Sequence, residues 1–481
     1  MAHTFYWHDY ETFGTDPRRD RAAQFAGVRT DPDLKVIGEP LVIYCRPAAD
    51  YLPQPDACVV TGITPQEAEQ KGVCEAEFIG LIHQQLARPQ TCTVGYNNIR
   101  FDDEVTRNLL YRNFFDPYVR EWQNGNSRWD LIDLARAARA LRPEGIHWPD
   151  NEDGNPSFRL EKLTAANGIS HAEAHDALSD VHATIAFARL IKQAQPKLYH
   201  FIFTHRKKAD VLELLQLGSM QPVLHVSGMY PARAGRIAVV VALCQHPGNA
   251  NGIVVYDLSV DPEPLLSLTA EQIRQRLYTR SEDLPVDTPR IPLKTVHINK
   301  CPVLAPMAVL RPQDAERLHI DPDIWQGNLK KLKTQKNLSG KLTEVFSAAE
   351  FPEYDDPDLM LYSGGFFSDA DKSVMQRIRQ TPVEKLATLH IKAQDPRIAE
   401  MFFRYRGRNH PETLHGEELQ RWRRFCLRRL TDREAGGGMV IEDYEKRLNV
   451  LQQEKAIAPG LLQALRQYGR SLIDNAQRDM D

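Results

Sequence analysis

The sequence lacks the features that mark secreted or membrane-spanning proteins. Only seven of its 481 residues are cysteine, and they are scattered, odd in number and without a Cys-x-x-Cys pair. This excludes a disulfide framework or a zinc knuckle and indicates a reducing compartment. No apolar run approaches the length of a membrane span, and the N-terminus lacks the basic-then-apolar layout of a signal peptide. The sequence therefore predicts a cytoplasmic protein without membrane contact.

The chain also has little net charge. At −4 it offers no global attraction to nucleic acid, so any site for a polyanion must be a local basic patch. The apolar fraction of 42% and the charged fraction of 26% are typical of globular proteins. The length allows two or three domains with cores of their own, and no convincing internal repeat divides it.

The most informative stretch is Phe5–Gly14, where aromatic residues lead into Asp9-Tyr10-Glu11. Aromatic residues favour a strand, and residues two apart on a strand point to the same face, so Asp9 and Glu11 project together. Two adjacent carboxylates resist joint ionisation unless a cation lies between them, and Mg²⁺ prefers such oxygen ligands. The pair predicts half of a metal site, although a solvated strand end would have the same sequence.

Three further residues complete the candidate site. Asp102 opens a helix after a strand and a turn, where an acidic residue could also simply compensate the helix dipole. His175 precedes a long helix, and Asp180 lies in its first two turns beside an apolar stripe. Four carboxylates can hold two divalent ions about 4 Å apart, which activate a water and stabilise the leaving oxygen of a phosphodiester. His175 is then the candidate general base.

The pattern of elements changes along the chain. Residues 1–194 read as mixed α/β, with strands expected at Ala22–Arg29, Leu41–Cys45 and Thr91–Tyr96 and helical spacing over Glu67–Gln85. Residues 195–347 read as a mainly β domain with a single helix at Thr269–Tyr278. Residues 348–365 form an acidic, proline-containing connector, and residues 366–481 are helical by pattern.

Three blocks of the sequence resemble the exonuclease motifs of the DEDD superfamily: His-Asp-Tyr-Glu-Thr-Phe-Gly, Gly-Tyr-Asn-Asn-x-Arg-Phe-Asp-Asp-Glu and Ala-His-Asp-Ala-x-x-Asp. The histidine before the last aspartate indicates the DEDDh branch, which has a ribonuclease-H-like α/β fold. Across essentially the whole chain the sequence is similar to the bacterial exonuclease I family, in which an SH3-like β domain and an all-α domain follow the exonuclease domain.

This resemblance implies a Mg²⁺-dependent 3′→5′ exonuclease that degrades single-stranded DNA to 5′-mononucleotides in DNA repair and recombination. The metal ligands would be Asp9, Glu11, Asp102 and Asp180, which would bind two Mg²⁺ ions, with Mn²⁺ as a substitute, and His175 would complete the catalytic set. The protein would act as a monomer.

A groove for single-stranded DNA needs cations for the backbone and aromatic platforms for the bases. The candidate contacts are mostly basic or aromatic, although each taken singly reads equally as a surface charge or a core residue: Glu11, Phe13, Arg107, Tyr118, Trp122, Arg136, Arg159, Lys208 and Lys294.

The resemblance also implies a partner, the acidic C-terminal tail of single-stranded DNA-binding protein. Such a tail needs an apolar pocket and an arginine or lysine for its carboxylate. Two Leu-Arg-Pro segments place Arg142 and Arg311 beside rigid turns, and Phe201 could form the apolar wall. Both arginines read equally well as ordinary loop residues.

Two other functions stay open. An RNA-trimming or proofreading exonuclease would use the same five residues, because the metals engage phosphate, which RNA and DNA share. A non-catalytic DNA-binding or scaffold protein built on a dead exonuclease fold would be expected to lack at least one ligand, and this sequence has all five.

Overall fold

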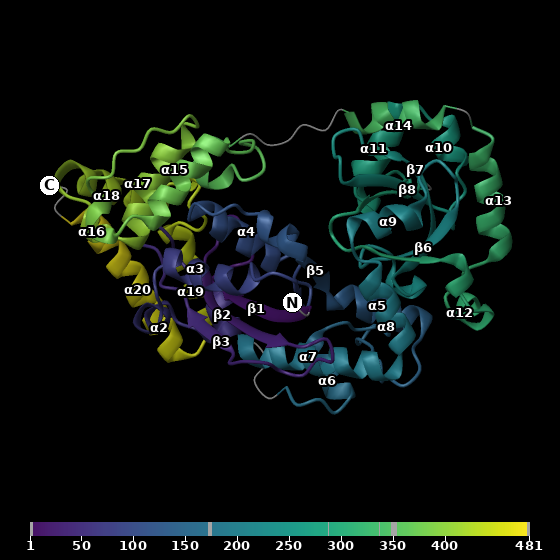
Figure 1. Ribbon diagram of the computed structural model, residues 1–481, viewed down its shortest axis with the longest axis horizontal. Helices are drawn as coiled ribbons and strands as arrows, with labels where there is room; N and C mark the ends of the chain where they lie inside the picture. Colours follow the sequence, from purple (N-terminus) through teal and green to yellow (C-terminus); the bar gives the residue numbers. More distant parts are fainter. Residues whose placement is uncertain (1–2, 172–175, 287, 336, 348–353, 479–481) are drawn as a thin grey trace. The chain divides into compact units, whose positions relative to one another are not determined.

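The computed structural model describes residues 3–171, 176–286, 288–335, 337–347 and 354–478. Among these residues no helix combines the length and the apolarity needed to cross a membrane. The chain folds into two compact units (Figure 1). The first consists of Met1–Arg128, His171–His182 and Pro352–Asp481, and the second of Trp129–Ser170 and Ala183–Phe351. The division at residues 194, 347 and 365 that the sequence suggests stays a prediction.

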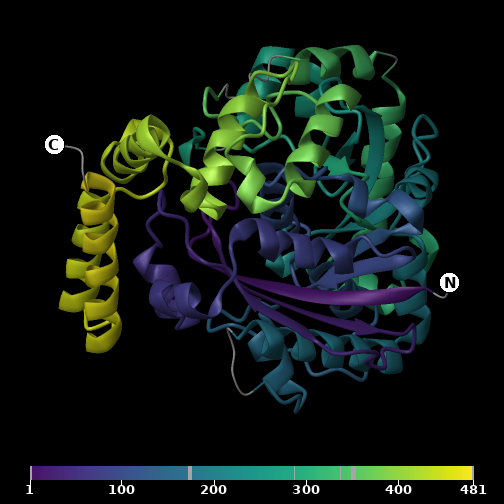
Figure 2. The same ribbon diagram turned by 60° about the vertical axis from the view of Figure 1, so that its left-hand side comes forward.

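The first unit is built on a five-stranded sheet of order β3-β2-β1-β4-β5. Its strands are β1 (Thr4–Thr12), β2 (Ala22–Thr30), β3 (Leu41–Tyr44), β4 (Thr91–Gly95) and β5 (Ser127–Asp130). β1 runs antiparallel to β2 and parallel to β4, and Figure 2 shows β1 and β2 side by side in purple. The strands expected in this region are confirmed, while the four-residue β5 was missed because it is too short to show a period.

Four helices follow the first strands: α1 (Pro55–Thr61), α2 (Pro65–Lys71), α3 (Glu75–Leu86) and α4 (Asp102–Arg112). The helical spacing over Glu67–Gln85 corresponds to two helices, because α2 ends at Lys71, with Gly72 as its C-cap, and α3 begins at Glu75. Val73 instead pairs with Cys45 beyond the end of β3, and its N–H donates to the Tyr44 carbonyl. Pairing with a strand thus overrides the helical spacing at this point.

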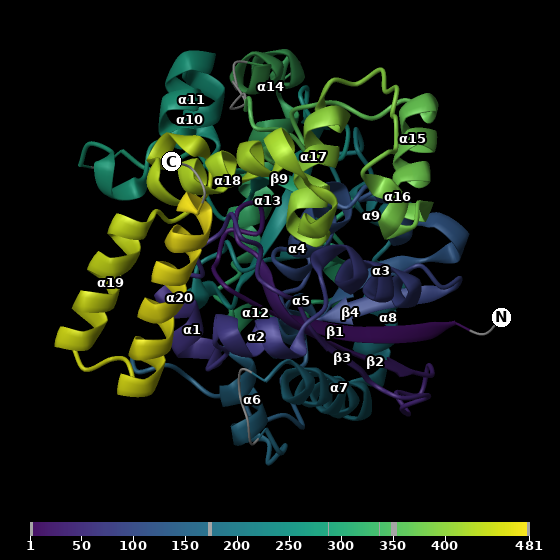
Figure 3. The same ribbon diagram turned by 90° about the vertical axis from the view of Figure 1, so that its left-hand side faces the viewer.

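The C-terminal part of the first unit is helical, as expected. It contains α15 (Asp369–Gln380), α16 (Val383–Leu386), α17 (Arg397–Asn409), α18 (Gly416–Thr431), α19 (Ile441–Gln453) and α20 (Pro459–Gln477). Figure 3 shows α19 and α20 beside α1 and α2. Trp422 and Tyr444 from these helices share one buried cluster with Phe13 and Tyr51 from the N-terminal region. The two ends of the chain therefore build a common core.

A buried ion network joins the same two regions. Asp50, which is fully buried before α1, accepts hydrogen bonds from Arg408 of α17 at 2.8 Å and forms an ion pair with Arg429 of α18 at 3.2 Å. Arg408 also reaches Asp358 at 2.6 Å. These guanidinium groups hold the pKa values of Asp50 and Asp358 below the ordinary range although burial opposes this. The network fixes the C-terminal helices to the N-terminal region.

The second unit contains a five-stranded antiparallel sheet of order β10-β6-β7-β8-β9. Its strands are β6 (Pro222–Val226), β7 (Ile237–Gln245), β8 (Gly252–Asp257), β9 (Leu293–His297) and β10 (Val303–Pro306). Alternate residues of these strands, including Val240, Ile253, Val255 and Leu304, fill one core. The β domain that the sequence indicated is thus centred on this sheet.

The expectation of a single helix between residues 195 and 347 is wrong. The helices of the second unit are α5 (Leu131–Leu141), α6 (Leu160–Ala166), most of α7 (Ala177–Ala194), α8 (Pro196–Thr204), α9 (Lys208–Leu215), α10 (Glu263–Ser267), α11 (Ala270–Tyr278), α12 (Pro312–Arg317), α13 (Pro322–Lys333) and α14 (Leu338–Ser347). Proline at the first position starts α8, α12 and α13. Proline is suited to the first position of a helix, so a proline that the sequence pattern suggests is a loop residue can instead begin a helix.

Candidate metal centre

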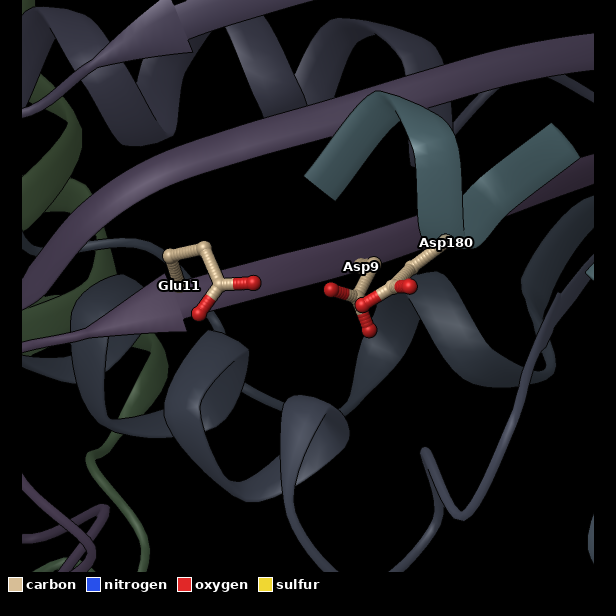
Figure 4. A group of neighbouring side chains, drawn as sticks. All are labelled: Asp9, Glu11 and Asp180. Atoms are coloured by element: carbon tan, nitrogen blue, oxygen red, sulfur yellow. The ribbon is translucent and has the colours of Figure 1, made fainter. Parts of the chain in front are cut away.

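The structure brings three of the predicted ligands together. Asp9 and Glu11 lie near the end of β1 on one face of the strand, and Asp180 lies in the first turn of α7. One carboxylate oxygen from each lies within 4.8 Å of one from each of the others. Figure 4 shows the Asp9 and Asp180 carboxylates turned toward each other, with Glu11 farther along the strand. The expected same-face placement of Asp9 and Glu11 therefore leads to a carboxylate cluster.

The cluster is electrostatically strained in the absence of a cation. Burial first, and then the neighbouring carboxylates of Asp180, Asp102 and Asp176, together raise the pKa of Glu11 to about 8. The pKa of Asp9 is also well above its ordinary value, first because of burial and then because of Asp102, Glu11 and Asp180. A divalent cation would relieve this repulsion, and an all-oxygen set of ligands suits a hard cation such as Mg²⁺.

Asp102 and Asp103 are adjacent at the start of α4 but have different surroundings. The Asp102 carboxylate accepts a hydrogen bond from the Tyr10 backbone N–H at 3.1 Å, between the two β1 carboxylates, and its charge acts on Asp9 and Glu11. The Asp103 carboxylate is fully buried and binds Arg120 and Arg128, each at 2.8 Å. Although burial opposes it, these guanidinium groups hold the pKa of Asp103 far below its usual range. Asp102 therefore faces the cluster, whereas Asp103 belongs to the core.

The start of α7 carries further polar groups at the cluster. Asp176 caps the helix by accepting the Ser179 N–H at 3.0 Å, and the Asp180 N–H donates to its carbonyl at 3.0 Å. The His171 side chain forms a short hydrogen bond through Nε2 with Oδ1 of Asp180. His175, the predicted general base, lies outside the described residues.

The predicted DNA contacts in the first unit differ in exposure. Trp122 is 65% exposed. Arg107 is only 5% exposed, and its guanidinium is engaged by Glu121 at 2.7 Å and by Glu104 at 2.8 Å. Tyr118 is half-buried, with the Arg107 guanidinium 5.5 Å from its ring centre.

Phe13, another of the predicted DNA contacts, is fully buried, with its ring in the core shared with the C-terminal helices. The Phe13 N–H donates to the Arg21 carbonyl at 2.8 Å, and the Tyr51 hydroxyl donates to the Phe13 carbonyl at 2.8 Å. These bonds fix the backbone just beyond β1 with the ring turned into apolar surroundings. Phe13 is a packing residue in this structure.

The remaining predicted DNA contacts lie in the second unit. The Arg159 side chain is 73% exposed, and Arg136 pairs with Asp133 at 2.5 Å. Lys208 donates to Asn251 at 2.8 Å. Lys294 donates to Ser227 at 2.6 Å and lies 4.2 Å from the ring centre of Tyr230. Contact of these residues with DNA stays a prediction.

The two Leu-Arg-Pro segments meet in the second unit. Arg311 binds Asp314 at 2.6 Å and Glu144 at 2.6 Å, and Arg142 forms an ion pair with Asp314 at 3.5 Å. Arg142 also donates to the Val309 carbonyl at 3.0 Å. Phe201 lies on α8 with its ring stacked on His205 at 4.1 Å. The two arginines thus share one carboxylate, and the binding of a partner there stays a prediction.

Sequence reasoning missed several residues near these sites. Asp176 lies inside the third motif block, but only His175 and Asp180 of that block were predicted to be catalytic residues. His171 is nine residues from Asp180, and that spacing gives no helical or strand signal. Phe366 is 88% exposed and Tyr362 is also exposed, and their rings lie 6.0 Å and 6.4 Å from that of Tyr118. Tyr362 lies within the segment predicted to be an acidic connector and Phe366 directly follows it, so the sequence did not indicate this aromatic group.

Three sequence families match the chain in succession. Residues 6–188 match the exonuclease family, residues 206–348 the exonuclease I SH3-like domain, and residues 355–472 the exonuclease I C-terminal domain. These matches confirm the expected order of an α/β exonuclease domain, an SH3-like β domain and a helical C-terminal domain.

Similar proteins cover the chain almost completely. The exodeoxyribonuclease I of Escherichia coli (strain K12) is 50% identical over 474 residues, which are 98% of each chain. The structure of a moderately thermophilic exonuclease I from Methylocaldum szegediense has a TM-score of 0.94 at 55% identity, and the match covers 98% of this chain and all of that one. A zinc-bound complex of Escherichia coli exonuclease I with single-stranded DNA has a TM-score of 0.93 at 49% identity, with the same coverage.

Proposed function

The chain belongs to the exonuclease I family and is an enzyme, and from this premise we propose that it is a Mg²⁺-dependent 3′→5′ exonuclease on single-stranded DNA. It would release 5′-mononucleotides and serve DNA repair and recombination. The single observation that carries the proposal is the cluster of Asp9, Glu11 and Asp180 carboxylates within 4.8 Å of one another.

The residues of this cluster fit a divalent metal. Their ligand atoms are all carboxylate oxygens, and the raised pKa values of Asp9 and Glu11 reflect repulsion that a cation would remove. We assign Asp9, Glu11, Asp102 and Asp180 to two Mg²⁺ ions, for which Mn²⁺ would substitute. When bound, such ions lower the pKa of a water and stabilise the charge on a leaving oxygen.

The protein's own groups would prepare this chemistry. β1 fixes two carboxylates on one face, and the hydrogen bond from the Tyr10 N–H orients Asp102 toward them. The Asp176 cap sets the first turn of α7 and with it the position of Asp180. His175 would accept the proton of the attacking water. The exposed rings of Tyr362 and Phe366 beside Tyr118 would offer bases a stacking surface, as single-strand sites require.

The decisive experiment is digestion of a 3′- or 5′-end-labelled single strand with Mg²⁺ or EDTA, with the matched duplex as a control. We expect mononucleotides from the single strand with Mg²⁺ and none in EDTA. Asp9→Ala, Asp102→Ala and Asp180→Ala should abolish cleavage while the fold is retained. Full activity in EDTA or in any of the three variants would refute the metal assignment.

The role of His175 is tested separately. A positioned general base contributes on the order of 10²–10⁴-fold, so His175→Ala should slow cleavage by about that factor while single-strand affinity in EDTA is unchanged. A much smaller loss at neutral pH would show that another group accepts the proton.

The choice between DNA and RNA rests on the two domains beyond the exonuclease domain, because the carboxylate cluster engages phosphate in either nucleic acid. The test is parallel digestion of DNA and RNA oligonucleotides of the same sequence. We expect the DNA strand to be degraded much faster, and equal rates would favour an RNA-trimming or proofreading enzyme.

We further propose that Arg142, Arg311 and Phe201 bind the acidic C-terminal tail of single-stranded DNA-binding protein. The support is that Arg142 and Arg311 converge on Asp314, although about 170 residues separate them in sequence. Arg317 pairs with the same carboxylate at 3.0 Å, so three guanidinium groups contact the buried Asp314, and one of them, that of Arg311, also binds the exposed Glu144. The excess positive charge suits a carboxylate-ended peptide.

A tail peptide titrated against wild type, Arg142→Ala and Arg311→Ala tests this site. Either substitution should weaken binding, while Arg233→Ala, at an exposed arginine of the same unit, should not. All three variants should still digest naked single strands normally. Unchanged peptide affinity in both Arg142→Ala and Arg311→Ala would remove these residues from the site.

A further inference from the structure

A histidine that belongs to none of the three motif blocks contacts the metal cluster. His171 lies before the start of α7, nine residues ahead of Asp180, and both belong to the first unit. Its Nε2 forms a short hydrogen bond with Oδ1 of Asp180, one of the three clustered carboxylates. The His171 side chain is only 5% exposed, so its ring is held by packing rather than by chance contact at the surface.

The carboxylates around Asp180 explain why a hydrogen bond from His171 would matter. The charged groups that most perturb Asp9 and Glu11 are other carboxylates, namely Asp102, Asp180 and Asp176. Repulsion among these groups would turn the Asp180 side chain away from the cluster unless something holds it. A nitrogen donor on Oδ1 provides that hold, because a carboxylate has about four lone-pair sites and can accept a hydrogen bond while it binds a cation.

We propose that His171 is a positioning residue of the metal centre: its Nε2 holds the Asp180 carboxylate in the orientation that binds the divalent metal. This inference rests on the proposed function, since it concerns the same cluster, and it adds a residue to that site. His171 would not touch the nucleic acid or transfer the proton of the attacking water, which is the role assigned to His175. Groups that orient metal ligands typically change metal affinity by about 10–100-fold when they are removed.

The substitutions are chosen to separate a hydrogen bond from packing. His171→Ala removes both the ring and the donor. His171→Gln retains a nitrogen donor at a similar reach, whereas His171→Met has a comparable size and no donor. His182→Ala is the matched control, since His182 is an exposed histidine two residues after Asp180 on the same helix.

The measured quantity is the affinity of the full-length protein for Mn²⁺ without DNA. Electron paramagnetic resonance monitors it, because the signal of free Mn²⁺ falls as the ion binds. We expect His171→Ala and His171→Met to weaken Mn²⁺ binding by about 10–100-fold, His171→Gln to recover most of the affinity, and His182→Ala to match wild type. Melting in EDTA reports the fold. If His171→Ala fails to fold, the comparison of His171→Gln with His171→Met still decides the question.

Two outcomes would overturn the inference. Equal Mn²⁺ affinity in His171→Gln, His171→Met and wild type would make His171 a packing residue. Tighter binding without the donor would make it a competitor that occupies the position of the metal. Failure of the proposed function gives a different result, because wild type itself would then digest no single strand with Mg²⁺ and Asp180→Ala would bind Mn²⁺ as wild type does.

Discussion

Carboxylate side chains that are close together in this sequence can lie in very different environments in the structure. Asp102 and Asp103 are neighbours at the start of α4, yet one faces the metal cluster and the other is neutralised by two buried arginines. Glu11 is buried among carboxylates and carries a pKa of about 8. The same side chain therefore faces the carboxylate cluster at one position and neutralises buried arginines at the next.

The Asp102 and Asp103 environments predict opposite effects for the same substitution. Asp103→Asn should reduce the free energy of unfolding by about 3–5 kcal/mol, because it leaves the buried Arg120 and Arg128 without a full countercharge. Asp102→Asn should abolish cleavage without that loss of stability. Urea unfolding in EDTA and a digestion assay measure the two effects, and equal destabilisation by both substitutions would contradict the distinction.

The raised pKa of Glu11 predicts a pH dependence of the metal-free protein. Between the ordinary pKa of 4.5 and about 8 the folded state binds a proton that the unfolded state has released. Stability is therefore lost as pH rises through this window, by at most about 1.4 kcal/mol per pH unit for one carboxyl group. Unfolding in EDTA at pH 5.5 to 8.5 should show a steeper decline for wild type than for Glu11→Gln. Saturating Mg²⁺ should remove the difference, and parallel pH profiles in EDTA would refute the assignment.

Helices and loops far apart in sequence are joined by ion pairs of two kinds. Asp50 links the segment before α1 to α17 and α18 through buried guanidinium groups, whereas Asp56 of α1 pairs with Arg447 of α19 near the surface at 2.6 Å. Buried charges that lose a partner are costly, while exposed pairs contribute little because water and salt screen them.

These two pairs form a matched test of how the C-terminal helices are held. Asp50→Asn should destabilise the protein by about 3–5 kcal/mol, and Asp56→Asn by about 0–1 kcal/mol. Chemical denaturation monitored by tryptophan fluorescence measures both, helped by Trp422 in the shared core. A small effect of Asp50→Asn would show that apolar packing alone fixes these helices.

Over the whole chain the net charge of −4 opposes a polyanion, so binding of DNA must come from local cations. Several of the arginines in the structure are unsuited to this role because carboxylates already neutralise them, as Glu121 and Glu104 do for Arg107. The Arg159 side chain is 73% exposed and its ion pair with Glu161 is long, at 3.9 Å, so Arg159 is better placed to meet a phosphate.

The salt dependence of single-strand affinity can count such contacts. Each phosphate contact contributes about −0.7 to the slope of log K against log salt concentration. Arg159→Ala should make the slope shallower by about that amount, while Arg424→Ala, an exposed arginine of α18, should not change it. Fluorescence anisotropy with a labelled oligonucleotide in EDTA measures both slopes. An unchanged slope in Arg159→Ala would remove it from the contact surface.

The sequence alone determined the order of the domains and which two carboxylates of the first strand share a face. Asp9 and Glu11 share a face because strand geometry alternates over two residues, a local rule that needs no knowledge of the rest of the chain. Aromatic, acidic and glycine spacing in the three blocks carried the family resemblance, which the domain matches confirm. Such patterns can be predicted from the sequence because they depend only on residues a few positions apart.

Only the tertiary structure decided which side chains meet over long distances. Whether Asp102 or Asp103 faces the cluster depends on where Arg120 and Arg128 lie, and the burial of Phe13 depends on helices about 400 residues away. The contact of His171 with Asp180 and the convergence of Arg142 and Arg311 on Asp314 likewise have no periodic signal. These contacts form because the whole folded chain buries apolar groups and neutralises charges together. The spacing of residues within a short segment carries no information about such long-range contacts.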